Sequence, residues 1–500
     1  MFHKYRLEII VFITGFVLMV LEIVGSRVLA PYVGSTIYTW TSLIGLILAS
    51  LSLGYYLGGL LADKKPTFSP LCFIVFLSGC YIGVINITKD YILEMLQKVV
   101  PEIRFQTILA TLILFAPPSI LLGSVLPYSV KLKISSLKKS GSTTGKLYAI
   151  SSLGSLIGTF SAGYLLIPSF GSSGILTWLT IILITTSFAT YINRFSRIPF
   201  IFFIMLSLIV LSFLRFFVEN DRFVIETHYD RVWIRETIDR ESGRPVLLLI
   251  TSGRVYQSGM FLDNTEELYF PYLKFFRLAK HFNPGIKKAL MIGGGAYSYP
   301  RDFLNNFPEA TLDVVEIDPK MTDLAKQYFR LKDNPRLKIF HHDGRTFLNT
   351  TNNKYDAIYL DVFISFMPPF QLTTKEAILK LYNSLNDRGV VLMNIVSAID
   401  GKQGEFLRSE YATFKTIFPQ VYLFPVNSIA QSRIVQNIIL VSIKSKDGVY
   451  LDSSDPELSS YLKHLYTKDV LMDTTILTDD FAPIENYIIK SQEKISFKIF

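Results

Sequence analysis

The chain has 500 residues, more than one hydrophobic core usually organises, so at least two domains are expected. Half of the residues are hydrophobic, 18% are charged, and the formal net charge is +9. The positive charges form no basic stripe interleaved with aromatic residues, which argues against nucleic acid as a partner. Cys72 and Cys80 share one apolar segment, which argues against a disulfide framework and a cysteine-based metal site.

Residues 1–218 are dominated by apolar and small side chains, and charges become frequent only after Glu219. A membrane-spanning helix needs about 20 apolar residues. Seven segments qualify, at about 7–29, 38–62, 69–88, 105–127, 147–168, 172–192 and 198–217. We therefore predict an α-helical transmembrane bundle with the lipid bilayer as a partner. The fourth segment contains Pro117-Pro118 and is expected to be kinked or broken.

The loops between these segments differ in positive charge. Eleven basic residues lie in the N-terminus and the even-numbered loops, namely Lys4, Arg6, Lys64, Lys65, Lys131, Lys133, Lys138, Lys139, Lys146, Arg194 and Arg197. The odd-numbered loops hold three, Lys89, Lys98 and Arg104. Because positive loops stay in the cytoplasm, the N-terminus is predicted to be cytoplasmic. Seven crossings would then place the rest of the chain outside.

Two ionisable residues, Glu22 and Arg27, fall inside the first segment. Charged side chains at membrane depth are costly and often functional. The alternative is structural: the two side chains pair with each other, or Arg27 extends to the interface. Both interpretations stay open at this point.

After the apolar half, residues 219–285 contain alternating segments such as VIETHYDRVWIRETI and RPVLLLITSGRVYQSGMF, which predict a small antiparallel β subdomain. From residue 286 to 500, seven strand patterns alternate with helical ones. This order predicts a doubly wound α/β sheet, in which ligands bind at the carboxyl ends of the strands.

Three polar features follow consecutive strands of that sheet. Gly293, Gly294 and Gly295 follow the first strand, Glu316 ends the second, and Asp343 ends the third. Glycines let backbone approach a ligand, and a carboxylate accepts ribose hydroxyls or an adenine amino group. The segment GGGAYS lacks the third glycine of a dinucleotide loop, so a ligand without pyrophosphate is favoured. S-adenosylmethionine and its decarboxylated form are such ligands.

Asp361 ends the fourth strand in the segment YDAIYLDVF. Its apolar neighbours would raise the pKa of the carboxyl toward that of a useful general base. A helix cap or an adenine contact is the alternative role.

The chain resembles the membrane-bound branch of the polyamine aminopropyltransferases, that is, spermidine synthase and its relatives. The resemblance rests on LEIVGSRVLAPYVGSTIYTW, GYYLGGLLADKK, GKLYAISSLGSLIGTFSAGYLLIPSFG and TDDFAPIENY, and it covers nearly the full length. It implies a Rossmann-like methyltransferase-type sheet in residues 286–500. It also implies transfer of the aminopropyl group of decarboxylated S-adenosylmethionine to a polyamine, releasing methylthioadenosine, with no prosthetic group.

The resemblance also assigns site residues. Glu316 matches the ribose-binding acid, Asp343-Gly344 the adenine-binding pair, and Asp361 the acid that deprotonates the attacking amine. Gln257 lies near the family's glutamine, although its spacing from Gly253 differs. The substrate-binding candidates are Tyr269, Asp479, Asp480 and Glu485.

Three positions depart from the family pattern. Ala296 stands where an acid holds the aminopropyl end of the donor, Tyr269-Phe270-Pro271 replaces a tyrosine-histidine-glutamate triplet, and Ile364 replaces a second acid. Losing carboxylates for buried ammonium groups should weaken spermidine synthesis unless other groups replace them. Tyr297, Tyr299, Phe363 and Phe366 could hold a cation over their rings, or serve as core or lid.

Two other functions therefore remain: methyl transfer from S-adenosylmethionine, and a polyamine transporter or sensor whose soluble domain only binds ligand. Adenosylated donors are cytosolic, so the catalytic domain of a multi-pass inner-membrane protein is expected in the cytoplasm. This requires that one of the seven segments, the fourth or the last, does not cross. Soluble members of the family are commonly dimers, which makes a homodimer a further expectation.

Overall fold

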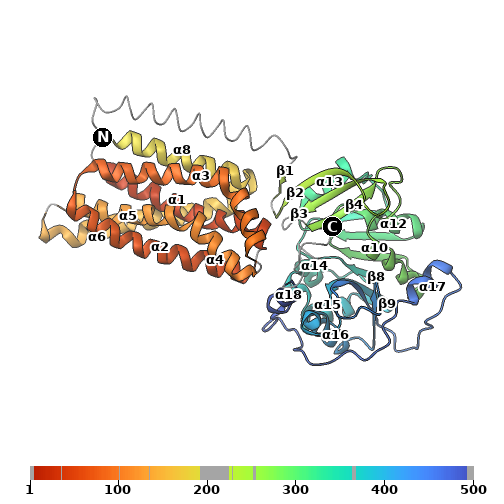
Figure 1. The fold of residues 1–500 in the computed structure, drawn as a ribbon. Helices are drawn as coiled ribbons and strands as arrows, with labels where there is room; N and C mark the ends of the chain where they lie inside the picture. Colours follow the sequence, from red (N-terminus) through yellow and green to blue (C-terminus); the bar gives the residue numbers. More distant parts are fainter. Residues whose placement is uncertain are drawn as a thin grey trace. The chain divides into compact units, whose positions relative to one another are not determined.

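A computed structural model of the chain describes residues 5–34, 36–100, 102–134, 136–191, 224–227, 229–251, 255–362 and 368–492. The chain divides into two compact units, Met1–Arg222 and Phe223–Phe500 (Figure 1).

The first unit is helical. Its helices are α1 (Arg6–Val33), α2 (Ile37–Lys64), α3 (Phe68–Val99), α4 (Ile103–Leu114), α5 (Ala116–Lys133), α6 (Ser140–Ser161), α7 (Ile167–Ser169) and α8 (Ser172–Thr190), with a π-helical turn at Ala162–Leu166. Five long helices are apolar enough to cross a membrane, and α4 with α5 makes a sixth if the bent pair is one span. Six predicted segments therefore coincide with these helices, whereas 198–217 lies outside the described residues.

The bend in the fourth segment lies where the sequence predicts it. Helices α4 and α5 meet at Phe115 with a bend of 49°, directly before the paired prolines at the start of α5. Proline has no N–H to donate and clashes with the preceding turn, so the α4 helix ends there and a new one begins.

Contacts between helix ends show how many times the chain runs from one end of the helical bundle to the other. Lys133, at the end of α5, pairs with Glu8 at the start of α1, 3.1 Å from Nζ to Oε1. Arg6 donates to the carbonyl oxygen of Thr190, the last residue of α8, at 3.3 Å. The first helix therefore begins at the end of the bundle where α5 and α8 finish. Among the described helices, the chain makes six passes and returns to the end where it started.

The second unit begins with a four-stranded antiparallel sheet in the order β1 (Val224–Glu226), β2 (Arg231–Ile238), β3 (Pro245–Thr251) and β4 (Val255–Phe261). A short helical stretch follows, formed by α10 (Pro271–Phe275), a 3₁₀ turn (Phe276–Leu278) and α11 (Ala279–Phe282). It leads the chain into a larger sheet.

The larger sheet has seven strands in the order β10-β11-β9-β8-β5-β6-β7. The strands are β5 (Lys288–Ile292), β6 (Thr311–Val315), β7 (Leu337–Phe340), β8 (Tyr355–Leu360), β9 (Leu385–Ser397), β10 (Gln420–Pro425) and β11 (Gln436–Ile443). All seven predicted strands are present. The sheet is mixed because β11 runs antiparallel to both β9 and β10. This order is that of a Rossmann-like, methyltransferase-type α/β domain.

Helices cover both faces of the seven-stranded sheet (Figure 1). Those after β5 are α12 (Ser298–Asn306), α13 (Pro319–Tyr328), α14 (Gly344–Thr350), α15 (Lys375–Asn383), α16 (Glu405–Lys415), α17 (Pro456–Leu462) and α18 (Ile484–Gln492). Alternate strand residues pack into two apolar layers: Ala357 and Tyr359 of β8 face one layer, and Ile358 and Leu360 face the other. Strands β5 and β8 are parallel neighbours. From β5 the chain proceeds through β6 to β7 at one edge, whereas from β8 it continues in the other direction, so the crevice expected for a ligand lies at their carboxyl ends.

Candidate active site

The glycine turn after β5 brings that strand close to the end of β8. Gly293 has φ +91°, and a Cβ atom at this position would overlap the carbonyl oxygen of Asp361. The two strand ends are also bonded, since the Asp361 N–H donates to the Ile292 carbonyl at 3.0 Å. Only glycine combines this backbone conformation with this approach. The turn therefore places the candidate nucleotide loop directly beside the candidate base.

Glu316 shapes the same loop from the neighbouring strand. Its Oε2 accepts the N–H groups of Gly294 at 2.9 Å and Gly295 at 3.1 Å, and its Oε1 accepts that of Asp318 at 3.0 Å. Burial raises the pKa of this carboxyl, whereas the three N–H donors act in the opposite direction. The acid predicted to hold ribose thus also fixes the course of the glycine loop, a role the sequence did not indicate.

Asp343 and Gly344 begin the helix after β7. Asp343 Oδ1 accepts the N–H of Thr346 at 2.9 Å and caps α14, and a Cβ atom on Gly344 would lie 2.6 Å from the Ile292 side chain. Gly344 therefore packs closely against the end of β5. The adenine contact that the resemblance implies for it stays a prediction.

Asp361 is held by two side chains. Its Oδ2 accepts the Tyr272 hydroxyl at 2.9 Å, and its Oδ1 accepts an Asn394 amide N–H at 3.1 Å. Asn437 on β11 donates in turn to the Asn394 carbonyl oxygen at 2.9 Å. Burial raises the pKa of the Asp361 carboxyl, and the two donors partly offset this rise. The carboxylate is thus fixed in orientation, with the raised pKa that a general base needs.

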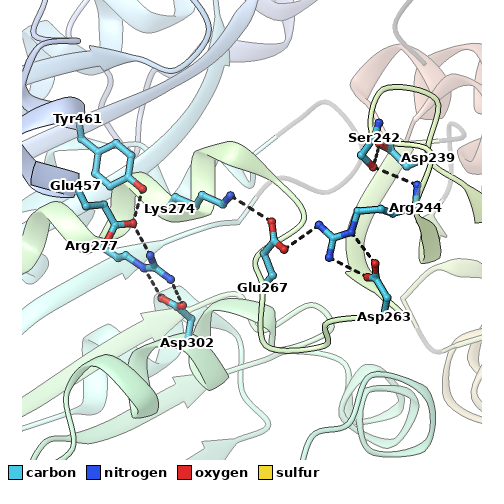
Figure 2. A network of polar contacts seen from close by, with 10 residues as sticks. All are labelled: Asp239, Ser242, Arg244, Asp263, Glu267, Lys274, Arg277, Asp302, Glu457 and Tyr461. Carbon is cyan, nitrogen blue, oxygen red and sulfur yellow. Dashed lines mark hydrogen bonds and ion pairs between the residues drawn. The ribbon is translucent and has the colours of Figure 1, made fainter.

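Figure 2 shows two arginine clusters, centred on Arg244 and Arg277, which lie before and after Tyr272 in the chain. Before it in the chain, Arg244 binds both oxygens of Asp263 at 2.8 Å and Glu267 Oε2 at 2.8 Å. After it, Arg277 binds Asp302 at 3.0 and 2.5 Å and Glu457 at 2.5 Å. Bidentate arginine–carboxylate pairs have a narrow geometry. They therefore limit how far the segment between them can move.

Gln257 and Ala296 lie where the small sheet meets the glycine loop. Gln257 occupies an irregularity in the pairing of β3 with β4, next to Ser258, whose hydroxyl oxygen accepts the Ala296 N–H at 3.0 Å. Ala296 is fully buried in an apolar cluster with Leu247 and Met260. Where the family places a donor-binding acid, this chain thus has a packing contact.

The remaining candidates lie in different surroundings. The Tyr269 hydroxyl donates to Asp239 at 3.0 Å, and Asp479 binds Arg345 and Thr374, each at 2.6 Å. Asp480 is exposed, and Glu485 lies in the first turn of α18. Their substrate-binding roles stay predictions.

The aromatic residues that could hold a cation also lie in different surroundings. Tyr297 and Tyr299 are buried in the apolar core, as the core interpretation expected. Phe363, Ile364 and Phe366 lie outside the described residues. Within the described ranges, no group of three or more His, Cys, Asp or Glu residues is arranged to hold a metal ion.

Residues 274–428, which carry the glycine turn, Glu316, Asp343 and Asp361, match the family model described as the spermine/spermidine synthase domain. The C-terminal unit carries a spermine/spermidine synthase domain. A polyamine aminopropyltransferase from Vibrio vulnificus is 28% identical over 233 residues, which is 44% of this chain and 75% of that protein. A probable polyamine aminopropyl transferase from Bifidobacterium longum is 28% identical over 219 residues, 39% of this chain and 48% of that protein. The chain thus spans three quarters of the first relative and about half of the second.

Solved structures named as spermidine synthases are also similar to this chain. A probable spermidine synthase from Corynebacterium glutamicum has a TM-score of 0.41 at 23% identity and covers 49% of this chain and 88% of its own. The spermidine synthase from Thermotoga maritima has a TM-score of 0.37 at 17% identity and covers 53% and 86%.

The C-terminal unit contains two candidate site residues that sequence reasoning missed, Tyr272 and Asn394. Tyr272 follows the Tyr269-Phe270-Pro271 triplet, and its position one residue after the triplet was the available signal. Asn394 stands in the middle of an apolar strand, where a lone amide needs a partner. Neither signal identifies Asp361 as that partner without the fold.

We predict that Gly293→Ala destabilises the synthase domain by about 3 kcal/mol, because the new methyl group meets the Asp361 carbonyl at a strained φ. The matched control is Gly243→Ala, which also has a positive φ, +68°, but has open space around its Cβ position. It should cost only about 1 kcal/mol. Thermal unfolding of the purified full chain measures both. Equal losses would mean that the two strand ends separate without cost.

Proposed function

We propose that the chain is a membrane-bound aminopropyltransferase-like enzyme. It transfers the aminopropyl group of decarboxylated S-adenosylmethionine to a polyamine, such as putrescine to give spermidine, and releases methylthioadenosine. The observation that carries the proposal is the position of Asp361 within the synthase domain. Its carboxylate is oriented by Tyr272 and Asn394, and its backbone lies against the glycine turn.

In the proposed reaction, the neutral amine nitrogen of the acceptor attacks the methylene carbon of the aminopropyl group that is bonded to the sulfonium sulfur. The carbon–sulfur bond breaks, and its electron pair returns to sulfur, which leaves as neutral methylthioadenosine. The nitrogen then carries an extra proton, which the Asp361 carboxylate accepts. A raised pKa favours this transfer, and the hydrogen bonds from Tyr272 and Asn394 hold one oxygen toward each donor.

The nucleoside would occupy the crevice between the glycine loop and α14. A carboxylate offers about four lone-pair sites, and backbone N–H groups fill three of those on Glu316. We therefore infer a single hydrogen bond from Glu316 to a ribose hydroxyl rather than a bidentate one. Asp343 and Gly344 would contact adenine, and Gln257 would approach from the small sheet.

The ammonium groups of donor and acceptor remain the demanding part of this proposal. Ala296 supplies no charge, and the Asp479 carboxylate is already bound by Arg345. We propose that the exposed Asp480, together with Glu485 in the first turn of α18, compensates an ammonium group in place of the missing acids. We therefore expect weaker binding of both substrates than in relatives that keep the acids.

We predict that Asp361→Asn lowers the release of methylthioadenosine from decarboxylated S-adenosylmethionine and putrescine by about 100-fold or more. Tyr272→Phe keeps the ring and removes one donor to the carboxylate, so the Asp361 pKa rises. Because the base acts when deprotonated, the acidic limb of the pH–rate profile should move upward by about one pH unit. Chromatographic assay of methylthioadenosine across pH measures both effects.

Tyr269→Phe is the control for this pair of variants, since its hydroxyl bonds Asp239 and not Asp361. Its acidic limb should stay at the wild-type pH. The proposal fails if folded wild-type protein releases no methylthioadenosine with putrescine or longer amines.

The buried Ala296 favours a second candidate, methyl transfer from S-adenosylmethionine, because that donor does not need the missing acid in the same place. We predict that titration calorimetry on the full chain gives tighter binding of the decarboxylated donor. A preference for S-adenosylmethionine of about tenfold or more would favour methyl transfer and argue against the leading proposal.

We also propose that the helical unit spans the inner membrane and that the synthase domain faces the cytoplasm. The basic loops lie at the end of the bundle where α1 begins, and α5 and α8 finish at that same end. This supports a crossing by the bent α4–α5 pair, so the conflict over seven crossings moves to segment 198–217.

Fusions after Tyr191 and after the last residue of the full chain test this arrangement. We predict that a fluorescent protein is bright at both sites and that periplasmic alkaline phosphatase is inactive at both, because each site would be cytoplasmic. An active phosphatase at the C-terminus alone would place the synthase domain outside. An active phosphatase after Tyr191 would contradict the six crossings.

A further inference from the structure

The helical unit contains an internal repeat. The pattern Ser-Leu-Gly-x-x-x-Gly-x-x-x-Ala occurs at residues 52–62 in α2 and again at residues 152–162 in α6 and its π-helical turn. A second pair of similar segments joins α1 and α5, where Gly-x-Val-Leu occurs at residues 15–18 and 123–126. Helices α1 and α2 are thus matched by α5 and α6, in the same order along the chain.

The matched positions also make matched contacts. Gly154 and Gly158 of α6 lie against the backbone oxygens of Phe12 and Phe16 in α1. The equivalent glycines of α2, Gly54 and Gly58, lie against the backbone oxygens of Ile120 and Ser124 in α5, and these occupy the positions that match Phe12 and Phe16. Since small residues let helix backbones meet, α1–α6 and α2–α5 form two equivalent, tightly packed helix pairs.

The contacts also give the helix directions. Within each pair the helices are parallel, because residue numbers rise together along both contacts. Helix α5 is antiparallel to α1, since its last residue, Lys133, pairs with Glu8, and Phe115, at its start, lies 3.3 Å from the Cβ position of Gly25. The matched helices α1 and α5 therefore run in opposite directions.

The third helix of each half follows the same rule. Ser187 of α8 donates to the carbonyl oxygen of Cys72 near the start of α3, and Asn86 of α3 bonds Thr177 near the start of α8, so these two helices are antiparallel. The six passes are thus two three-helix repeats of opposite orientation, α1–α2–α3 and α5–α6–α8. Inverted repeats of this kind build many secondary transporters, where exchanging the conformations of the two halves moves access from one side of the membrane to the other.

The match fails at one position in the middle of α1. Glu22 matches Val130 in α5, and it lies about 24 Å along the helix axis from Arg6 and about 17 Å from Val33. Glu22 lies three residues before Gly25. A Cβ atom on Gly25 would lie 3.0 Å from the Leu43 side chain of α2. Residues three apart share a helix face, so Glu22 lies toward the other helix pair.

No hydrogen bond or ion pair joins the Glu22 carboxylate to another side chain in the described part of the chain, so the pairing with Arg27 is not formed. The contact of Gly158 with Phe16 brings the π-helical turn Ala162–Leu166 to the same level of the bundle. Such turns occur frequently at functional sites. A carboxylate without a protein cation at this depth is costly, and a cation that enters from the water would offset that cost.

We propose that the helical unit transports an amine cation, which binds the Glu22 carboxylate between the helix pairs α1–α6 and α2–α5. The cationic character follows from Glu22 and the repeats, and the choice of an amine rests on the proposed function. The amine cation crosses the membrane down its own concentration gradient, and no covalent bond is formed or broken. The two rigid pairs move relative to each other, and the bound cation faces one side and then the other.

The test is exchange of putrescine in liposomes that contain the full chain. Vesicles are loaded with unlabelled putrescine, and entry of radiolabelled putrescine is followed. Wild type should exchange well above protein-free vesicles, Glu22→Gln should lose at least tenfold, and Glu22→Asp should keep part of the rate. Glu94→Gln removes a different carboxylate of the same unit, and Asp361→Asn disables the other unit. Both should exchange as wild type does.

Folding of each variant is checked by gel filtration and thermal unfolding. The proposal is overturned if folded wild type exchanges no more putrescine than empty vesicles, or if Glu22→Gln exchanges as fast as wild type. Methylthioadenosine release is measured on the same preparations. If methylthioadenosine is released but putrescine is not exchanged, the transport proposal is wrong and the proposed enzyme activity stands. If putrescine is exchanged but no methylthioadenosine is released, only the proposed enzyme activity is wrong.

Discussion

The absence of a side chain at Gly293 is the constraint on which the candidate site depends. With no Cβ atom, the turn after β5 passes against the carbonyl oxygen of Asp361. The two strands at the switch point of the sheet can therefore end side by side, with the loop beside the candidate base. Glu316 then holds the next two glycines through their N–H groups. Any side chain at Gly293 would push the glycine loop away from Asp361.

The chemistry of Asp361 depends on a balance between burial and hydrogen bonding. Burial alone would raise the pKa of the carboxyl and keep it protonated over more of the pH range, and the donors Tyr272 and Asn394 limit the rise. Tyr272 comes from outside the sheet. Ion pairs of Arg244 and Arg277 lie on either side of it along the chain and limit the movement of its segment. The ion pairs thus act on the site through the position of one hydroxyl group.

The sequence predicted the seven strands and the acids at their ends, because those depend on local pattern and on the rule that parallel strands present their ends together. It could not predict what the side chains bind. Glu316 turns toward the glycine loop, Asp479 toward Arg345, and Tyr269 toward Asp239, and each choice depends on tertiary contacts. The repeated glycine pattern was present in the sequence, whereas the opposite direction of the two repeats required the paired helix ends.

The two repeats agree where packing demands it and differ where chemistry is possible. A glycine that meets the backbone of a parallel helix has no acceptable substitute, so both halves carry it at the same places. Position 22 has no such restriction, and one half has a carboxylate where the other has Val130. A bundle that served only to anchor the chain would gain nothing from this difference, since an unpaired carboxylate weakens insertion. A positively charged substrate that binds Glu22, as proposed above, would offset this cost.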